Sequence, residues 1–262
     1  MRFRAALLVP ACAAALVGGC HPAAPPPDLS LDPGQLLAQV REAGGAVQSA
    51  QGEARLKIRS SRGSGTVRQF TAAERPDRVH LEELDFFGNP AAVLVAAGGR
   101  FALYDARKKV LYRGAATPAN LARLVPLPMA AGDLVAVLLG TAPLSGDPVS
   151  VERGRGRLRL RLLDGDAALD LFVGPKALVE EFARAVAGGA GPGSYEVEFS
   201  QRAERGGVAF PLLMSLRSAP AHLEADLEWT EVKVNEPLDP SLFELTPPRG
   251  SRIVEVGQGG TD

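Results

Sequence analysis

The sequence predicts a mainly β protein with a few helices: a strongly curved antiparallel sheet of about ten or eleven strands, an incomplete half-barrel that a helical lid covers. Short segments of alternating apolar and polar residues follow one another along most of the chain, as in strands with one face in water. Turn-forming residues separate them, which favours a meander of sequential strands. Two short apolar helical segments interrupt the series and need a sheet to pack on.

The first 19 residues have the features of a secretory signal peptide. Two arginines supply a basic start, and the apolar residues 5–17 follow, too few to span a bilayer as a mature anchor. The segment ends in Leu16-Val17-Gly18-Gly19-Cys20, which resembles a bacterial lipobox. We therefore expect cleavage between Gly19 and Cys20 and lipidation of the Cys20 thiol. The alternative is an ordinary signal peptide in which the cysteine occurs by chance.

The remaining chain has the size of one domain. Residues 20–32 are proline-rich and predict an extended tether, residues 33–256 the domain, and residues 257–262 a flexible tail. The only other cysteine, Cys12, lies in the signal peptide, so no disulfide is expected. Lys and Arg number 29 against 30 Asp and Glu, which provides no basic excess to recruit nucleic acid. We expect a monomer.

The domain opens with a predicted helix. Asp32 is a favourable N-cap, Pro33 suits the first helical position, and the Gly44-Gly45 pair predicts a kink or a frayed middle. Strands are then expected over residues 54–58, 66–73, 77–84, 91–96, 100–105 and 109–112.

Two helical segments interrupt these strands. The first begins at Thr117-Pro118, and the second runs from Asp133 to Gly140. Because an apolar sheet face must be covered, these helices are its natural cover. Prolines and charges within residues 121–139 exclude a membrane-spanning helix there, so attachment to a membrane rests on the lipid at Cys20.

Strands resume after the helices. They are expected over residues 149–153, 157–163, 167–173, 195–201, 209–217 and 221–234. Residues 176–187 fit either a helix or an outer strand, because apolar residues recur there at spacing four. In the last strand the apolar phase changes after Trp229, which predicts a bulge near Thr230 and Glu231.

The sequence offers no catalytic or metal-binding pattern. His21, His80 and His222 have no second ligand at metal spacing, and no serine lies in a nucleophile elbow. The alternating Glu224, Asp226 and Glu228 are best interpreted as a solvated strand face. We expect no metal, no cofactor and no enzymatic activity.

Two surface features stand out. The first is an arginine row, in which a period of two would place the guanidinium groups of Arg153, Arg155, Arg157, Arg159 and Arg161 on one side. This basic face is either an ordinary wet surface or a contact for anionic head groups or an acidic partner. The second is Phe86-Phe87-Gly88 in the turn after residue 84. The two phenylalanines either fold back on the core or protrude to touch lipid.

The order of elements and motifs over residues 52–140 resembles that of the LolA/LolB-like lipoprotein carrier superfamily, and most closely that of the outer-membrane lipoprotein receptor LolB. The resemblance rests on a strand, the Phe86-Phe87-Gly88 loop where that family carries a Pro-Leu-Gly-type loop, a strand bearing Tyr104, and a proline-containing helical insertion. The ending Leu242-Phe243-Glu244-Leu245, followed by two prolines, also resembles the C-terminal pattern of the superfamily.

The resemblance implies an incomplete barrel whose concave apolar face takes the acyl chains of lipoproteins, with the helices as a movable cover. Phe87 stands where the exposed leucine of the family would be, so the loop is expected to insert cargo into the membrane. The implied partners are a periplasmic LolA-like carrier and the outer membrane; the absence of Asp after Cys20 favours that membrane. The residues assigned to the lid and cavity are Leu121, Leu124, Leu127, Leu134, Val137, Leu138 and Trp229.

The chain departs from the family in two ways. The loop has lost its proline and gained an aromatic pair, and aromatic residues make up only 5% of the chain. An envelope lipoprotein of the same fold that binds a hydrophobic ligand, or acts as a scaffold without transport, is therefore the alternative function.

Overall fold

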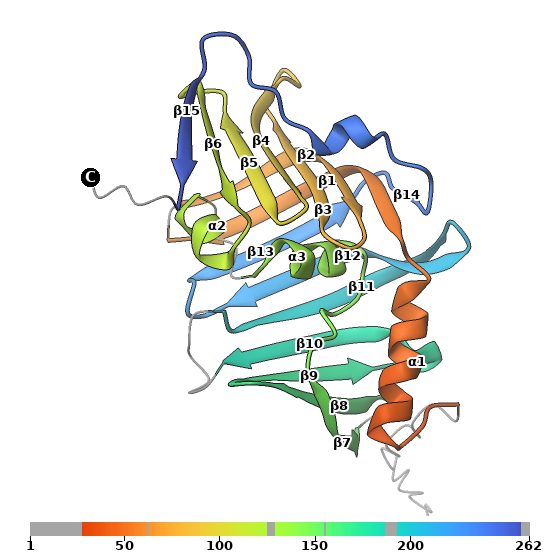
Figure 1. The fold of residues 1–262 in the computed structure, drawn as a ribbon. Helices are drawn as coiled ribbons and strands as arrows, with labels where there is room; N and C mark the ends of the chain where they lie inside the picture. Colours follow the sequence, from red (N-terminus) through yellow and green to blue (C-terminus); the bar gives the residue numbers. More distant parts are fainter. Residues whose placement is uncertain (1–27, 62, 125–128, 155, 187–192, 258–262) are drawn as a thin grey trace, which may run out of the picture.

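The computed structural model describes residues 28–61, 63–124, 129–154, 156–186 and 193–257. The predictions for the signal peptide, for Cys20, Leu127 and Arg155 and for the last five residues concern positions outside these ranges. Within them the chain is mainly β: one large, strongly bent sheet, not closed into a barrel, carries three α-helices (Figure 1).

Two meanders make up the sheet, and they meet where β1 pairs with β13. The first comprises β1 (Ser49–Ser60), β2 (Gly63–Glu74), β3 (Arg78–Leu84), β4 (Pro90–Ala97), β5 (Arg100–Asp105) and β6 (Val110–Ala115). The second comprises β7 (Asp147–Arg153), β8 (Leu158–Asp164), β9 (Ala167–Val173), β10 (Val179–Val186), β11 (Tyr195–Arg205), β12 (Val208–Ser218) and β13 (Leu223–Trp229).

Two further strands make the sheet mixed. β14 (Lys233–Val234) returns to pair with β1, and β15 (Arg252–Val256) lies parallel to β6 at one edge. The described residues thus form fifteen strands, so the expected ten or eleven were too few and the expectation of a wholly antiparallel sheet was wrong. Turn chemistry predicts only which consecutive strands are neighbours, and β15 pairs with a strand far away in the sequence.

Along the chain, one helix precedes the first meander and two helices lie between the meanders. α1 (Pro33–Gly45) begins as predicted, because the Asp32 carboxylate accepts a hydrogen bond of 2.8 Å from the amide of Gln35. It ends at Gly45, so the glycine pair terminates the helix instead of kinking it. α1 packs beside β7 and β8 (Figure 1), while α2 (Pro118–Leu124) and α3 (Ala131–Leu138) connect β6 to β7.

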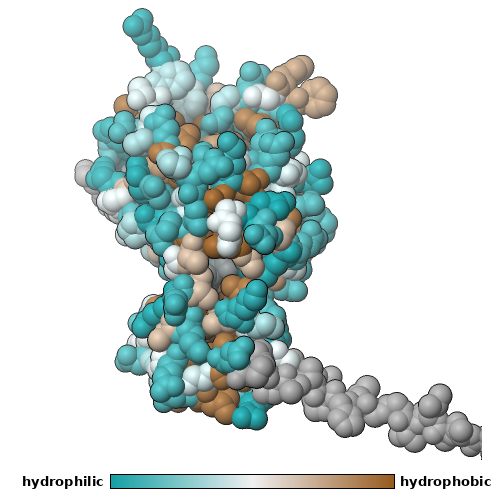
Figure 2. Space-filling view, turned by 90° about the vertical axis from the view of Figure 1, so that its right-hand side faces the viewer, coloured by the Kyte–Doolittle hydropathy of each residue, from teal (hydrophilic) through white to brown (hydrophobic). Residues whose placement is uncertain are grey.

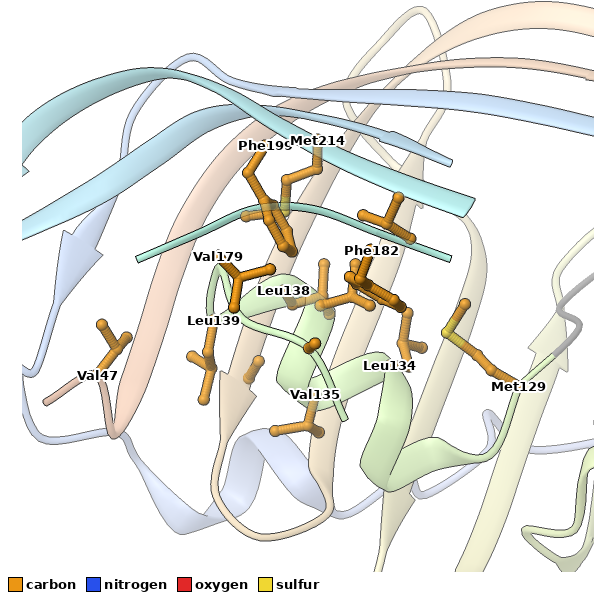
Figure 3. Packing of buried hydrophobic residues seen from close by; sticks show 14 of the residues in the cluster. Val47, Met129, Leu134, Val135, Leu138, Leu139, Val179, Phe182, Phe199 and Met214 are labelled. Carbon is orange, nitrogen blue, oxygen red and sulfur yellow. The ribbon is translucent and has the colours of Figure 1, made fainter. Parts of the chain in front are cut away.

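α3 lies inside the concave face and forms the centre of the main hydrophobic core. Leu134 and Leu138 point toward Phe182 and the strands above them, whereas Val135 points to the opposite side of the helix (Figure 3). A helix of eight residues is marginal alone, and burial on nearly every side stabilises it here. The core therefore joins α3 to both meanders.

A smaller cluster covers the convex face. The short 3₁₀ helix Pro240–Phe243 places Phe243 against Val93 and Val95 of β4, and the Arg78 guanidinium lies 4.3 Å from the centre of the Phe243 ring. The Nδ1 atom of His80 lies 2.6 Å from the carbonyl oxygen of Leu242. The C-terminal segment thus straps the outside of β3 and β4.

Most of the ambiguous segment 176–187 forms the strand β10 (Val179–Val186), and a 3₁₀ turn over Pro175–Ala177 precedes it. β10 pairs with β9 on one side and β11 on the other, and its register shifts between Val179 and Glu181. The extra residue brings Val179 and Phe182 into the core at a spacing of three. The spacing of four between Leu178, Phe182 and Val186 is even, so it fits the period of two of a strand as well as a helix.

The predicted bulge after Trp229 is confirmed. The amides of Thr230 and Glu231 both donate to the carbonyl oxygen of Glu53, at 2.9 and 3.1 Å. The chain then continues into β14, where Val234 is buried. Opposite the bulge, a Cβ on Gly52 would lie 2.1 Å from the carbonyl oxygen of Glu231, so only glycine fits.

We predict that Gly52→Ala lowers the free energy of unfolding by more than about 2 kcal/mol, because the added methyl group forces the bulge apart at a backbone with positive φ. Gly65→Ala is the matched control, since a Cβ there has no neighbour within 4 Å. Urea unfolding followed by circular dichroism measures both. Equal midpoints for the two variants would contradict this account of Gly52.

Candidate functional site

The candidate site is an apolar cavity between α3 and the concave face, with a volume of about 340 Å³. Strands of both meanders contribute to it. Its lining consists of Leu56, Ile58, Val67, Gln69, Leu81, Glu83, Ala92, Leu94, Leu103, Leu134, Val137, Leu138, Met214, Leu216, Leu223, Ala225 and Leu227. Fifteen of these residues are apolar, so the cavity can exclude water and hold a hydrocarbon group.

The walls of the cavity are incompletely packed. Leu56, Ile58, Val67, Leu81 and Leu103 all lie on the inner face, yet each is only half-buried. Protein interiors are otherwise packed as densely as organic crystals. Half-buried leucine, isoleucine and valine side chains around one hollow therefore mark a surface on which a guest would bury further apolar area.

Two polar side chains interrupt this lining. Gln69 is 4% exposed, and its amide donates to the hydroxyl of Thr71 at 2.7 Å. Glu83, its cross-strand neighbour, is exposed. One polar group thus lies inside the cavity and one at its opening.

The structure divides the residues assigned to the lid and cavity into two groups. Leu134, Val137 and Leu138 of α3 line the cavity. Leu121 and Leu124 of α2 pack against the main core away from it. Trp229 is also a core residue, with its indole 6.1 Å from the ring of Phe210.

Most of the lining residues were not predicted from the sequence. Ile58, Val67, Leu103 and Leu216 have only the alternating pattern of an inner strand face as a signal. The pattern shows which residues lie on the inner face of a strand. It does not show which inner faces lie opposite one another, because that depends on strand pairing across the two meanders.

The Phe86-Phe87 tip protrudes from the turn between β3 and β4, with side chains 93% and 84% exposed. Figure 2 shows hydrophobic groups standing clear of the surface at the upper end of the molecule, where this turn lies in Figure 1. The Asp85 carboxylate accepts hydrogen bonds of 2.8 Å from the amides of Phe87 and Asn89. These bonds to the ionised form, the one from Asn89 foremost, lower the pKa of Asp85 and order the turn.

The expected basic face is not a free cationic surface. The chain reverses between Gly154 and Arg157, so Arg153 belongs to β7 and the other described arginines to the next strand or its approach. Arg159 and Arg161 donate to Asp170 at 2.7 Å, and Arg157 donates to Glu181 at 2.9 Å. Cross-strand carboxylates therefore neutralise Arg157, Arg159 and Arg161; Arg155 lies outside the described residues.

Other charged residues also pair across strands. Glu224 and Glu228 of β13 form ion pairs with Arg59 and Arg55 of β1, which gives them the structural role expected of a solvated face. Within the described ranges, His, Cys, Asp and Glu nowhere gather into a group that could hold a metal ion. No helix in the described part of the chain is both long and apolar enough to cross a membrane.

No protein-family model and no curated protein matches the sequence, but solved structures share the fold. A LolA superfamily protein from Nitrosomonas europaea superimposes with a TM-score of 0.57 at 12% identity, over 82% of this chain and 99% of that one. A putative outer membrane lipoprotein-sorting protein domain from Vibrio parahaemolyticus gives 0.57 at 10% identity, over 79% and 95%. A DUF1329 family protein from Desulfovibrio piger gives 0.56 at 12%, over 80% and 94%. The fold is thus LolA-like.

We predict that Asp170→Asn lowers the free energy of unfolding by about 1–2 kcal/mol at pH 7. Hydrogen bonds from Arg161 and Arg159 lower the pKa of Asp170 to about 2. A lowered pKa stabilises the fold above the unfolded pKa of about 4, and this stabilisation is lost as the pH falls toward 2. The difference from wild type should therefore shrink between pH 4 and pH 2.

Urea titrations across that pH range measure the effect. Asp166→Asn, in the exposed turn between β8 and β9, is the control and should leave stability unchanged. A deficit for Asp170→Asn that is the same at pH 2 and pH 7 would exclude ionisation as its source.

Proposed function

We propose that this protein is a LolB-like lipoprotein, anchored to the periplasmic face of the outer membrane through Cys20, that binds acyl chains in its cavity. In this role it accepts lipoproteins from a periplasmic LolA-like carrier or inserts them into the membrane, and it catalyses no reaction. The incompletely packed apolar hollow beside α3 is the observation that carries the proposal.

The cavity supplies the chemistry that such a role requires. Burial of a hydrocarbon chain yields about 0.8 kcal/mol for each methylene group, and it needs no catalytic residue. A carrier must also release its cargo, so the lining should bind weakly and without strong directional contacts. Half-buried leucine, isoleucine and valine side chains meet that requirement. The name of the Vibrio parahaemolyticus domain, a putative lipoprotein-sorting protein, agrees with this function.

The Phe86-Phe87 tip supplies the second requirement, contact with a lipid surface. Its two rings are held on a turn that Asp85 orders, at the end of β3. Glu83 of β3, three residues before Phe86, is exposed and lines the cavity at its opening. The tip and the opening are therefore close enough along the chain for cargo to pass between the cavity and the membrane.

We predict that the double variant Phe86→Glu/Phe87→Glu binds liposomes at least tenfold more weakly, because each inserted phenylalanine contributes about 1.5–3 kcal/mol. Liposome flotation of the protein carrying Cys20→Ala isolates this contact from the lipid anchor. Insertion of a purified lipoprotein into liposomes should fall in parallel.

Leu163→Glu is the control, since Leu163 is an exposed leucine of β8 and lies in the other meander. Unaltered transfer by the double variant would remove the tip from the mechanism. Normal ligand binding together with no transfer by the wild-type protein would favour the non-transporting lipoprotein.

We predict that Ala225→Leu reduces binding of a single-chain ligand at least fivefold, because the larger side chain occupies space within the cavity. Ala115→Leu, at an exposed position of β6, should leave binding unchanged. Mass spectrometry of lipid that co-purifies with each variant, together with displacement of the neutral dye Nile red, measures the loss. Equal binding by both variants would mean that ligand occupies another site.

A further inference from the structure

The cavity has one charged side chain in its lining, and this charge is negative. Gln69, Glu83 and Ala92 form a cross-strand row over β2, β3 and β4 on the inner face. All three contribute to the cavity, and Glu83 is the exposed member of the row that carries a carboxylate. An exposed carboxylate at the edge of an apolar cavity stays hydrated and is placed to contact the polar head group of a ligand.

The carboxylate of Glu83 differs in its surroundings from that of Asp105. Among the described residues it forms no ion pair, whereas Asp105, the next carboxylate along the same row, is held by the ammonium group of Lys108 at 3.0 Å. The described lining residues include no lysine, arginine or histidine. The local charge at the opening is therefore that of a free carboxylate, which accepts hydrogen bonds and donates none.

The size of the cavity limits the hydrocarbon part of the ligand. Its 340 Å³ is about twice the volume of the ~150 Å³ engineered cavity that holds benzene, so it has room for roughly a dozen carbon atoms. One chain, or the terminal part of one chain, fits, and several chains side by side do not. With the chain inside, the head group of the ligand must lie at the opening, near Glu83.

We propose that the cavity takes a single-chain amphiphile whose head group donates hydrogen bonds, an ammonium or an amide N–H, and that Glu83 is the residue that selects it. This inference rests on the proposed acyl-chain binding and specifies its ligand class. Free fatty acids and phosphate-bearing heads are disfavoured, because like charges meet beside a surface of low dielectric. A chain joined to a peptide through an amide presents the preferred donor.

Three ten-carbon ligands test this selection: decylamine, decanamide and decanoate, which differ only in the head group. At pH 7.5 the amine is cationic, the amide neutral and the carboxylate anionic. Nile red displacement from the full chain carrying Cys20→Ala reports affinity for each. We expect decylamine and decanamide to bind about five- to tenfold more tightly than decanoate. The difference in affinity between decylamine and decanoate should become smaller in 0.5 M salt, because salt screens the charge of Glu83.

Variants of Glu83 assign the effect to this residue. Glu83→Gln should reduce the preference to less than about twofold, and Glu83→Lys should make decanoate the tightest ligand. Glu82→Gln is the matched control, because Glu82 is the next residue, projects from the other face of β3 toward His80, and does not line the cavity. It should retain the wild-type order.

The outcomes separate this inference from the proposed function. Equal affinity of the wild-type protein for all three ligands overturns the selection by Glu83 and leaves acyl-chain binding intact. Selection by Glu83 is also overturned if the Glu83→Gln variant keeps the wild-type preference among the three ligands. Failure of all three ligands to bind overturns both proposals.

Discussion

One constraint governs this structure: the concave face of a large sheet must be covered, and the element that covers its middle is a single short helix. α3 has eight residues and is therefore about 12 Å long. β1 and β2, which line the same cavity as α3, have twelve residues each, about 40 Å of strand. α3 is buried on nearly every side because it fills the centre. The inner residues beyond its reach, Leu56, Ile58 and Val67 among them, stay half-buried. The cavity follows from this difference in length.

Many charged side chains of the described residues pair across strands, and against this background the cavity and the Phe86-Phe87 tip stand out. Charged residues of β8, β9 and β10 neutralise one another across strands, and so do those of β1 and β13. The C-terminal segment covers the convex face of β3 and β4 with Phe243. The cavity beside α3 and the turn with two exposed rings are, by contrast, apolar surfaces that other described residues leave uncovered. A function in handling hydrophobic chains uses both of them.

The negative charge at the cavity opening adds a second basis on which ligands can be distinguished. An apolar hollow by itself distinguishes guests by length and shape, since hydrophobic burial is non-directional. Under the proposal above, the Glu83 carboxylate at the opening would distinguish them by head group. Glu83 and the tip lie on the same β3–β4 hairpin, so one supersecondary unit would combine selection of the ligand with contact to the membrane.

The sequence alone determined the local features of this protein. Alternation located most strands, Asp32 located the start of α1, and the phase change after Trp229 located a bulge that the hydrogen bonds to Glu53 confirm. These features depend on residues close together in the chain, so local physics is sufficient. Only the tertiary structure decided the others. The pairing of β15 with β6 and the gathering of Ile58, Glu83 and Leu216 around one cavity each join segments far apart in the sequence. Alternation of apolar and polar residues with a period of two shows on which side of a strand a residue lies. Which strands come to face one another is a property of the whole sheet, because the bend of the sheet and the length of α3 set it.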